Sequence, residues 1–89
     1  MTEGTIEITN RRGLHARAAS KFVQLASNFS SSIRLSKGEV TVDGKSILGI
    51  LLLQAAKGTT LTLAVEGGDE EEAYRQLAEI ISNRFGEKK

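Results

Sequence analysis

Cysteine, proline and tryptophan are absent from this 89-residue sequence, which contains one histidine and one tyrosine. Without cysteine the chain can form neither disulfides nor a thiolate metal site. No hydrophobic run reaches about 18 residues and no basic-then-apolar leader is present, so we expect a cytoplasmic protein without a membrane role. The formal net charge of +1 argues against nucleic-acid binding, because such domains usually carry a strong basic excess.

The composition is that of a folded protein, with 39% hydrophobic and 26% charged residues. A chain of 89 residues is long enough for one compact domain and too short for two. We therefore expect a single domain over residues 1–89, with every element amphipathic and packed on one core.

Four segments alternate apolar and polar residues, which predicts half-buried strands. They are residues 5–9, 32–36, 39–43 and 59–66. Lys37-Gly38 separates the second from the third and predicts an antiparallel hairpin. Strands of this kind have one buried and one solvated face, so we expect an antiparallel sheet with all helices on one side.

Three segments predict helices. Apolar residues at helical spacing, Ala19, Phe22, Val23 and Ala26, favour a helix over 16–27 that ends at Asn28. Residues 47–56 are nearly all apolar, and the decision for a helix rests on Ser46 as N-cap and on Lys57-Gly58 as its end.

The third helix is expected to begin after Asp69 as N-cap, with Glu72 completing a capping box. Its buried stripe is Ala73, Leu77, Ile80 and Ile81, and we expect residues 87–89 to be frayed. The element order is then βαββαβα. This order and the alternating strands predict an α+β fold, an open-faced β-sandwich.

His15 follows Gly13 in a predicted turn that opens onto the first helix, with Arg11, Arg12, Arg17 and Lys21 nearby. The first amides of a helix lack intrahelical partners and attract anions. The same helix end disfavours an imidazolium, which leaves a neutral, nucleophilic ring. Arg17 could donate two hydrogen bonds to phosphate oxygens. The residues thus indicate covalent phosphoryl carriage on His15, and without a second histidine, an acidic base or metal ligands they do not support hydrolysis.

Each candidate also has a purely structural interpretation. His15 could be a surface or capping histidine without function, and Ser46 could be only the N-cap of its helix. A phosphorylated Ser46 would instead add about two negative charges and repel an acidic partner. Ile47, Leu48 and Leu51 could be core residues, or an exposed docking patch with Arg17, Lys21 and Lys45 at its rim.

At Gly13-Leu14-His15-Ala16-Arg17, and again from Gly44 to Leu51, the sequence resembles the HPr family, the histidine-containing phosphocarriers of the bacterial phosphoenolpyruvate-dependent phosphotransferase system. The likeness covers nearly the whole chain, and the two motifs lie about 30 residues apart in one small domain. It implies a sheet of order 1-4-2-3 with three helices on one face.

The resemblance also implies roles and partners. His15 would accept a phosphoryl group on Nδ1 from enzyme I and pass it to IIA components of sugar permeases, with Arg17 beside the phosphate. Ser46 would be the regulatory site of an HPr kinase/phosphorylase found in many bacteria. The expected docking residues, of which the resemblance itself implies Ile47 and Leu48, are Ala16, Ser20, Lys21, Lys45, Ile47, Leu48 and Leu51. We expect a monomeric carrier that is not an enzyme and uses no cofactor or metal.

One position departs from the family pattern, because Ala18 stands where members usually have proline. Proline in the first turn pre-sets the start of a helix, so we expect a looser turn that still functions. Two other functions stay open. One is a regulatory binding protein controlled at Ser46, although such a protein would need neither His15 nor Arg17. The other is an RNA-binding sheet, which the absence of aromatic residues from the strands disfavours.

Overall fold

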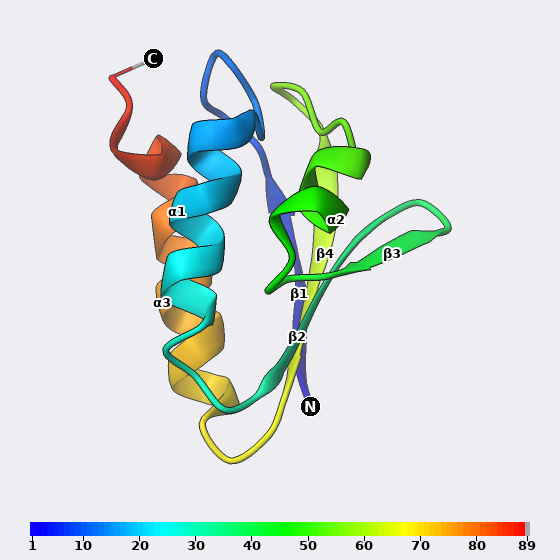
Figure 1. Cartoon of the computed structure of the whole chain (residues 1–89), viewed down its shortest axis with the longest axis vertical. Coiled ribbons are helices and arrows are strands. Elements are labelled where there is room, and N and C mark those ends of the chain that lie inside the picture. The colour runs from blue at the N-terminus through cyan, green and yellow to red at the C-terminus, as the bar shows by residue number, and fades with distance from the viewer. Residues whose placement is uncertain (89) are drawn as a thin grey trace.

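The computed structural model describes residues 1–88. Its elements in chain order are β1 (Thr2–Glu7), α1 (Ala16–Ala26), β2 (Ser32–Lys37), β3 (Val40–Asp43), α2 (Ile47–Leu52), β4 (Thr60–Glu66), α3 (Glu70–Ser82) and the short 3-10 helix η1 (Arg84–Gly86). The strands form one antiparallel sheet of order β1-β4-β2-β3. In Figure 1, α1 and α3 lie side by side along the sheet. The predicted α+β open-faced sandwich is confirmed.

The core lies between the sheet and the helices, and the alternation of the strands explains it. Leu61, Leu63 and Val65 of β4 are fully buried, whereas the residues between them face the other side of the sheet and are partly exposed. Phe22 of α1 and Leu77 of α3 are buried in the same core, on the side of the sheet that carries Leu61, Leu63 and Val65. Burial of such side chains contributes about 1.5–3 kcal/mol each, which is the main force that docks the helices.

Helix α2 is shorter than the sequence predicts. It ends at Leu52 instead of Ala56, and Gln54 takes a left-handed conformation with φ of 49° that turns the chain. Leu53 and Ala55 are buried beyond the helix, so the apolar run continues as packed loop. Lys57-Gly58 therefore does not end this helix, and that interpretation was wrong.

Several boundaries also differ. β1 begins at Thr2, which pairs with Val65 at the far end of β4, and it ends at Glu7 instead of Thr9. Ile8 still forms backbone hydrogen bonds with Thr59 and Gly58, the two residues before β4, outside the regular ladder. α1 ends at Ala26 with Ser27 as its cap. Asn28 is not among the residues with positive φ, so the predicted asparagine stop is wrong.

Asp69 is the N-cap residue of α3 by position, but its side chain makes no capping hydrogen bond. Its carboxylate accepts hydrogen bonds from the backbone nitrogens of Ser30 and Ser31 and from the Ser31 hydroxyl. The carboxylate of Glu70 instead accepts from the backbone nitrogen of Gly67, at 3.2 Å. The predicted capping box with Glu72 is therefore wrong, and Asp69 ties α3 to the loop before β2.

Candidate functional site

The loop before α1 places His15 by backbone contacts. Gly13 has a φ of 70°, a left-handed conformation that favours glycine, and the backbone nitrogen of Leu14 donates to the carbonyl of Ala55 at 2.8 Å. A Cβ at Gly13 would lie 2.5 Å from that same carbonyl oxygen. The close approach of two backbones fixes the loop, and His15 follows it in extended conformation as the N-cap residue of α1.

The two ring nitrogens of His15 have different partners. Nδ1 accepts a hydrogen bond from the backbone nitrogen of Arg17 at 3.3 Å, whereas Nε2 lies 2.5 Å from Oε2 of Glu87. A carboxylate accepts only, so the proton of a neutral ring belongs on Nε2. The lone pair is then on Nδ1, at the N-terminus of α1. This arrangement can form a bond from Nδ1 to phosphorus.

Glu87 is held from its other oxygen by a buried side chain. Nδ2 of Asn10, which is fully buried, donates to Oε1 of Glu87 at 3.1 Å and to the carbonyl of Gly13 at 2.8 Å. The hydrogen bond from His15 is the main reason that the pKa of Glu87 lies below its ordinary value. Glu87 is therefore a carboxylate at neutral pH, and the expectation of a frayed residue 87 was wrong.

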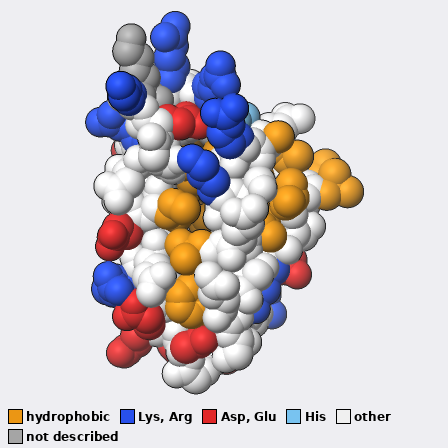
Figure 2. All heavy atoms as spheres, turned by 60° about the vertical axis from the view of Figure 1, so that its left-hand side comes forward, with side chains coloured by type: hydrophobic (Ala, Val, Ile, Leu, Met, Phe, Trp, Pro, Cys, Tyr) orange, Lys and Arg blue, Asp and Glu red, His pale blue; other side chains and the backbone are white. Residues whose placement is uncertain are grey.

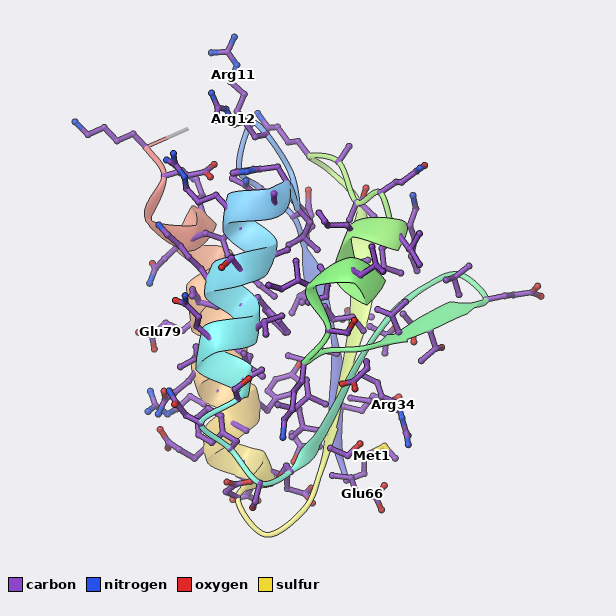
Figure 3. The ribbon with its side chains drawn as sticks, viewed as in Figure 1. Met1, Arg11, Arg12, Arg34, Glu66 and Glu79 are labelled. Carbon is purple, nitrogen blue, oxygen red and sulfur yellow. The ribbon has the colours of Figure 1, made fainter. Side chains whose placement is uncertain are left out.

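Basic side chains gather at this end of the molecule. Arg11, Arg12, Arg17 and Lys88 line a shallow hollow of about 390 Å³ together with Glu87. In Figure 3, Arg11 and Arg12 project from the loop before α1, whereas at the opposite end Glu66 lies together with Arg34 and Met1. The near-zero net charge thus hides a local concentration of positive charge, which favours an anionic ligand at the His15 end.

Two expected rim cations are already engaged with the backbone. Lys21 donates through Nζ to the carbonyl of Phe85 at 2.8 Å, and Lys45 donates to the carbonyl of Phe29 at 2.7 Å. Ala16 and Arg17 are exposed in the first turn of α1, and Ser20 is partly buried. Of these three cations, Arg17 is the one whose side chain makes no hydrogen bond or ion pair within residues 1–88, and it lies two residues from His15.

Ser46 begins α2, and its hydroxyl oxygen accepts from the backbone nitrogen of Gly49 at 3.0 Å. The next two side chains are exposed, Ile47 by 41% and Leu48 by 70%, which places them outside the core. Leu51 instead packs partly against the core, and Leu52 is 68% exposed in its place. Figure 2 shows a hydrophobic group beside the histidine and the basic cluster.

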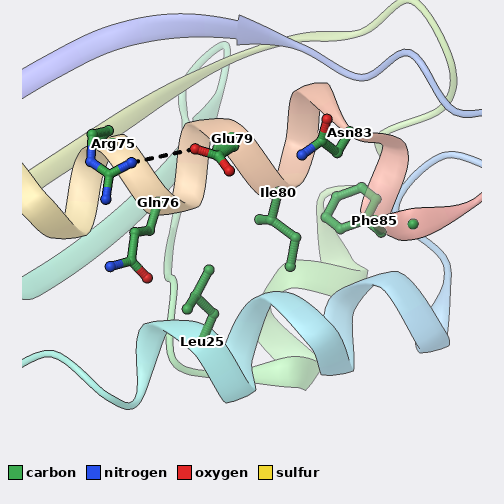
Figure 4. A pocket seen from close by; sticks show the side chains of 8 residues that line it. Leu25, Arg75, Gln76, Glu79, Ile80, Asn83 and Phe85 are labelled. Carbon is green, nitrogen blue, oxygen red and sulfur yellow. Dashed lines mark hydrogen bonds and ion pairs between the residues drawn. The ribbon is translucent and has the colours of Figure 1, made fainter.

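A hollow of about 500 Å³ lies between α1 and α3 (Figure 4), and neither His15, Ser46 nor any residue of α2 lines it. Leu25, Ile80 and Phe85 line it, and the ion pair of Arg75 with Glu79 spans 3.4 Å at its edge. None of the residues predicted for the site lines it. We therefore assign the chemistry to the end of the molecule that carries His15.

Sequence reasoning missed Asn10, Leu52 and Glu87. Glu87 is 72 positions from His15, and no local pattern links the two. Asn10 looks like an ordinary turn residue, and only its complete burial marks it as part of the site. Leu52 belonged to an apolar run whose exposed side could not be told from its buried side before the end of α2 was known.

The phosphorylation-site model of the HPr component of the phosphotransferase system matches residues 2–83. This chain belongs to the HPr family. The phosphocarrier protein HPr of Neisseria meningitidis is 49% identical over 87 residues, which are 98% of each chain. The family-model match covers both motifs and ends at residue 83, before Glu87.

Solved HPr structures have the same fold. The crystal structure of HPr from Thermoanaerobacter tengcongensis is similar with a TM-score of 0.96 at 49% identity, and all of both chains is covered. A crystal structure of an HPr dimer from the same organism gives a TM-score of 0.79 at 50% identity, with 98% of this chain and 100% of that chain covered.

Family membership settles the class of activity. HPr proteins are phosphocarriers of the phosphotransferase system in bacteria, so this chain is a phosphoryl carrier of that system and not an enzyme with its own turnover. Over residues 1–88, no helix combines the length and apolar character that crossing a membrane requires.

Proposed function

We propose that this chain accepts a phosphoryl group from phospho-enzyme I on Nδ1 of His15 and passes it to IIA components of sugar permeases. Support comes from one observation above all. Nε2 of His15 is engaged by Glu87, and Nδ1 is left with a lone pair at the N-terminus of α1. In the transfer, this lone pair forms the nitrogen–phosphorus bond while the bond from phosphorus to the donor atom breaks.

The surroundings suit the phosphorylated form. Once Nδ1 bonds phosphorus, the backbone nitrogen of Arg17 is free to donate to a phosphate oxygen, and its exposed guanidinium can add two further donors. These contacts stabilise negative charge. Both oxygens of the nearby Glu87 carboxylate are engaged, by His15 and Asn10, so this group is not free to activate a water for attack on the phosphoryl group. The group is held, and it stays available for transfer to the next partner.

The partners would dock on the exposed face that adjoins His15. Ile47 and Leu48 supply apolar contact, and the basic end supplies attraction to an acidic surface. The proposed docking face also includes the neighbouring residues Ala16, Ser20, Lys21, Lys45 and Leu51. We place the protein in the cytoplasm, as a monomeric single domain over residues 1–89 that binds neither nucleic acid nor membrane.

Ser46 is the proposed regulatory site, the substrate of an HPr kinase/phosphorylase. Its side chain is partly exposed next to Ile47 and Leu48, so a phosphate there would lie on the docking face. Two added negative charges would oppose the approach of an acidic partner. A carrier controlled in this way still requires His15, which separates it from the alternative of a purely regulatory protein.

The test is transfer of labelled phosphate from phosphoenolpyruvate, with Mg²⁺ and enzyme I, to this chain and then to a IIA protein. We expect an acid-labile label that is absent from His15→Ala and that moves to IIA. Arg17→Ala should slow the labelling, whereas Arg34→Ala, which removes an exposed arginine from β2, should not. Full labelling of His15→Ala would refute the assignment.

A further inference from the structure

The segment after α3 returns to the start of α1 and is fastened there. Arg84 and Phe85 have φ of 57° and 55°, a left-handed conformation that non-glycine residues rarely adopt. The side chain of Phe85 is 1% exposed, and its carbonyl accepts from Nζ of Lys21 at 2.8 Å. Burial of the ring and the hydrogen bond offset the unfavourable backbone. The ring and the hydrogen bond hold the chain in the direction that brings Glu87 to His15.

This segment places the carboxylate of Glu87 between Asn10 and His15. Oε1 accepts from Asn10 at 3.1 Å and Oε2 lies 2.5 Å from Nε2 of His15, so both oxygens are used. The side chains of His15 and Glu87 are only 23% and 19% exposed. A hydrogen bond shielded in this way is stronger than one in open water.

We propose that Glu87 is a positioning residue for His15, which keeps the ring proton on Nε2 and stabilises the ring while Nδ1 carries the phosphoryl group. This inference rests on the proposed function, because it concerns the same transfer. It reaches beyond the family model, whose match ends at residue 83.

The electron count shows where Glu87 would act. A neutral ring with its proton on Nε2 uses the Nδ1 lone pair to bond phosphorus, and the ring then carries a positive charge. On transfer a lone pair of the acceptor, the IIA component, bonds phosphorus as the Nδ1–phosphorus bond breaks; the electron pair of the broken bond returns to Nδ1, and a neutral imidazole with Nε2–H departs. Were the Nε2 proton lost first, the leaving group would be an imidazolate anion, which leaves far less readily. A carboxylate at Nε2 therefore favours transfer in both directions.

The other charges that face this ring act against its positive form. Arg11, Arg12, Arg17 and Lys88 line the hollow beside it, and the N-terminus of α1 adds the positive end of a helix dipole. Within residues 1–88, Glu87 is the carboxylate that lies against the ring. Because the hydrogen bond from His15 lowers the pKa of Glu87, the carboxylate stays ionised across neutral pH.

The deciding variant is Glu87→Gln, since an amide oxygen can still accept from Asn10 while the charge at Nε2 is lost. Nitrogen-15 NMR of the full, unphosphorylated chain measures the ratio of the two His15 tautomers. We expect Nε2–H almost alone in the wild type and a ratio reduced by about tenfold in Glu87→Gln. Glu71→Gln, an exposed change of equal charge, should match the wild type. An unchanged ratio in Glu87→Gln would overturn the proposal.

A second measurement follows release of the label from His15 as a function of pH. Release requires the protonated ring, so its midpoint should lie at lower pH in Glu87→Gln than in the wild type, with Glu87→Asp between them. Coincident profiles would overturn the role in the phosphorylated state. The tautomer ratio needs no phosphoryl donor, so it decides the positioning role even if the wild type accepts no label, a result that would overturn the proposed function instead.

Discussion

The hydroxyl oxygen of Ser46 lies 3.0 Å from the backbone nitrogen of Gly49, so the proposed regulatory residue is also the residue that begins helix α2. Helix α2 has only six residues and few internal hydrogen bonds, so the capping hydrogen bond is a large part of what stabilises it. The structural and regulatory interpretations of Ser46 are thus compatible, because an aspartate would also cap the helix while adding charge.

Ser46→Ala should lower the free energy of unfolding by about 1 kcal/mol, because it leaves the Gly49 nitrogen without its partner. Urea denaturation measures this. Ser82→Ala removes an exposed serine from the end of α3 and should change stability by less than about 0.5 kcal/mol. If the two variants have the same free energy of unfolding, Ser46 does not stabilise the protein as an N-cap.

Ser46→Asp should keep the fold and slow the labelling of His15 by enzyme I, because of the charge that it adds to the docking face. The rate of label uptake measures this, with Ser82→Asp as the control for an equal change in net charge. If both aspartate variants take up label at the wild-type rate, Ser46 does not control docking.

Leu48→Ala should weaken transfer from enzyme I while leaving the free energy of unfolding within about 0.5 kcal/mol of the wild type, because the side chain is 70% exposed. Val40→Ala is the matched control, an apolar change at a side chain of β3 that is 53% exposed. Transfer kinetics that are equal for the two variants would rule out Leu48 as a docking residue.

Gly13→Ala should destabilise the protein by about 3 kcal/mol and slow phosphorylation of His15. The new Cβ would lie 2.5 Å from the Ala55 carbonyl oxygen and 2.9 Å from the Cα of Ala56, both backbone atoms, at a left-handed φ. In Gly68→Ala the Cβ would meet no heavy atom within 4 Å, so urea denaturation should show little change. Similar losses in both variants would contradict the close approach at Gly13.

Asp69 should make stability depend on acid pH. The Ser31 hydroxyl, followed by the backbone of Ser30, holds the pKa of Asp69 below its ordinary value near 3.8. Because the folded pKa is the lower one, the stabilisation is complete above the unfolded value and is lost as pH falls through the folded value. The stability difference between wild type and Asp69→Asn should therefore shrink from about pH 6 to about pH 3, and a difference that stays constant would contradict this role of Asp69.

The sequence alone predicted the sheet, its hairpin and the order of the elements, because these follow from alternation and helical spacing. It failed where contacts between distant segments decide. Helix α2 ends at Leu52 because Leu53 and Ala55 are needed in the core, and no local signal marks that end. Asp69 bonds to the serine loop instead of its own helix for the same kind of reason.

The candidate site divides in the same way. His15, Arg17 and Ser46 lie in local motifs, and the sequence placed them at helix starts, where the structure has them. Glu87 reaches His15 only because two residues with positive φ and the burial of Phe85 turn the chain back. That path of the chain depends on the packing of α3 against α1, a long-range contact that no local sequence pattern predicts.

The most direct test of the account locates the phosphorus atom in the phosphorylated protein. Phosphorus-31 and nitrogen-15 NMR, after incubation with phosphoenolpyruvate, Mg²⁺ and enzyme I, distinguish the two ring nitrogens of His15 from each other and from a serine. We expect a single phosphorus bonded to Nδ1. Phosphorus on Nε2, an acid-stable phosphate on Ser46, or no phosphorylated product at all would contradict it.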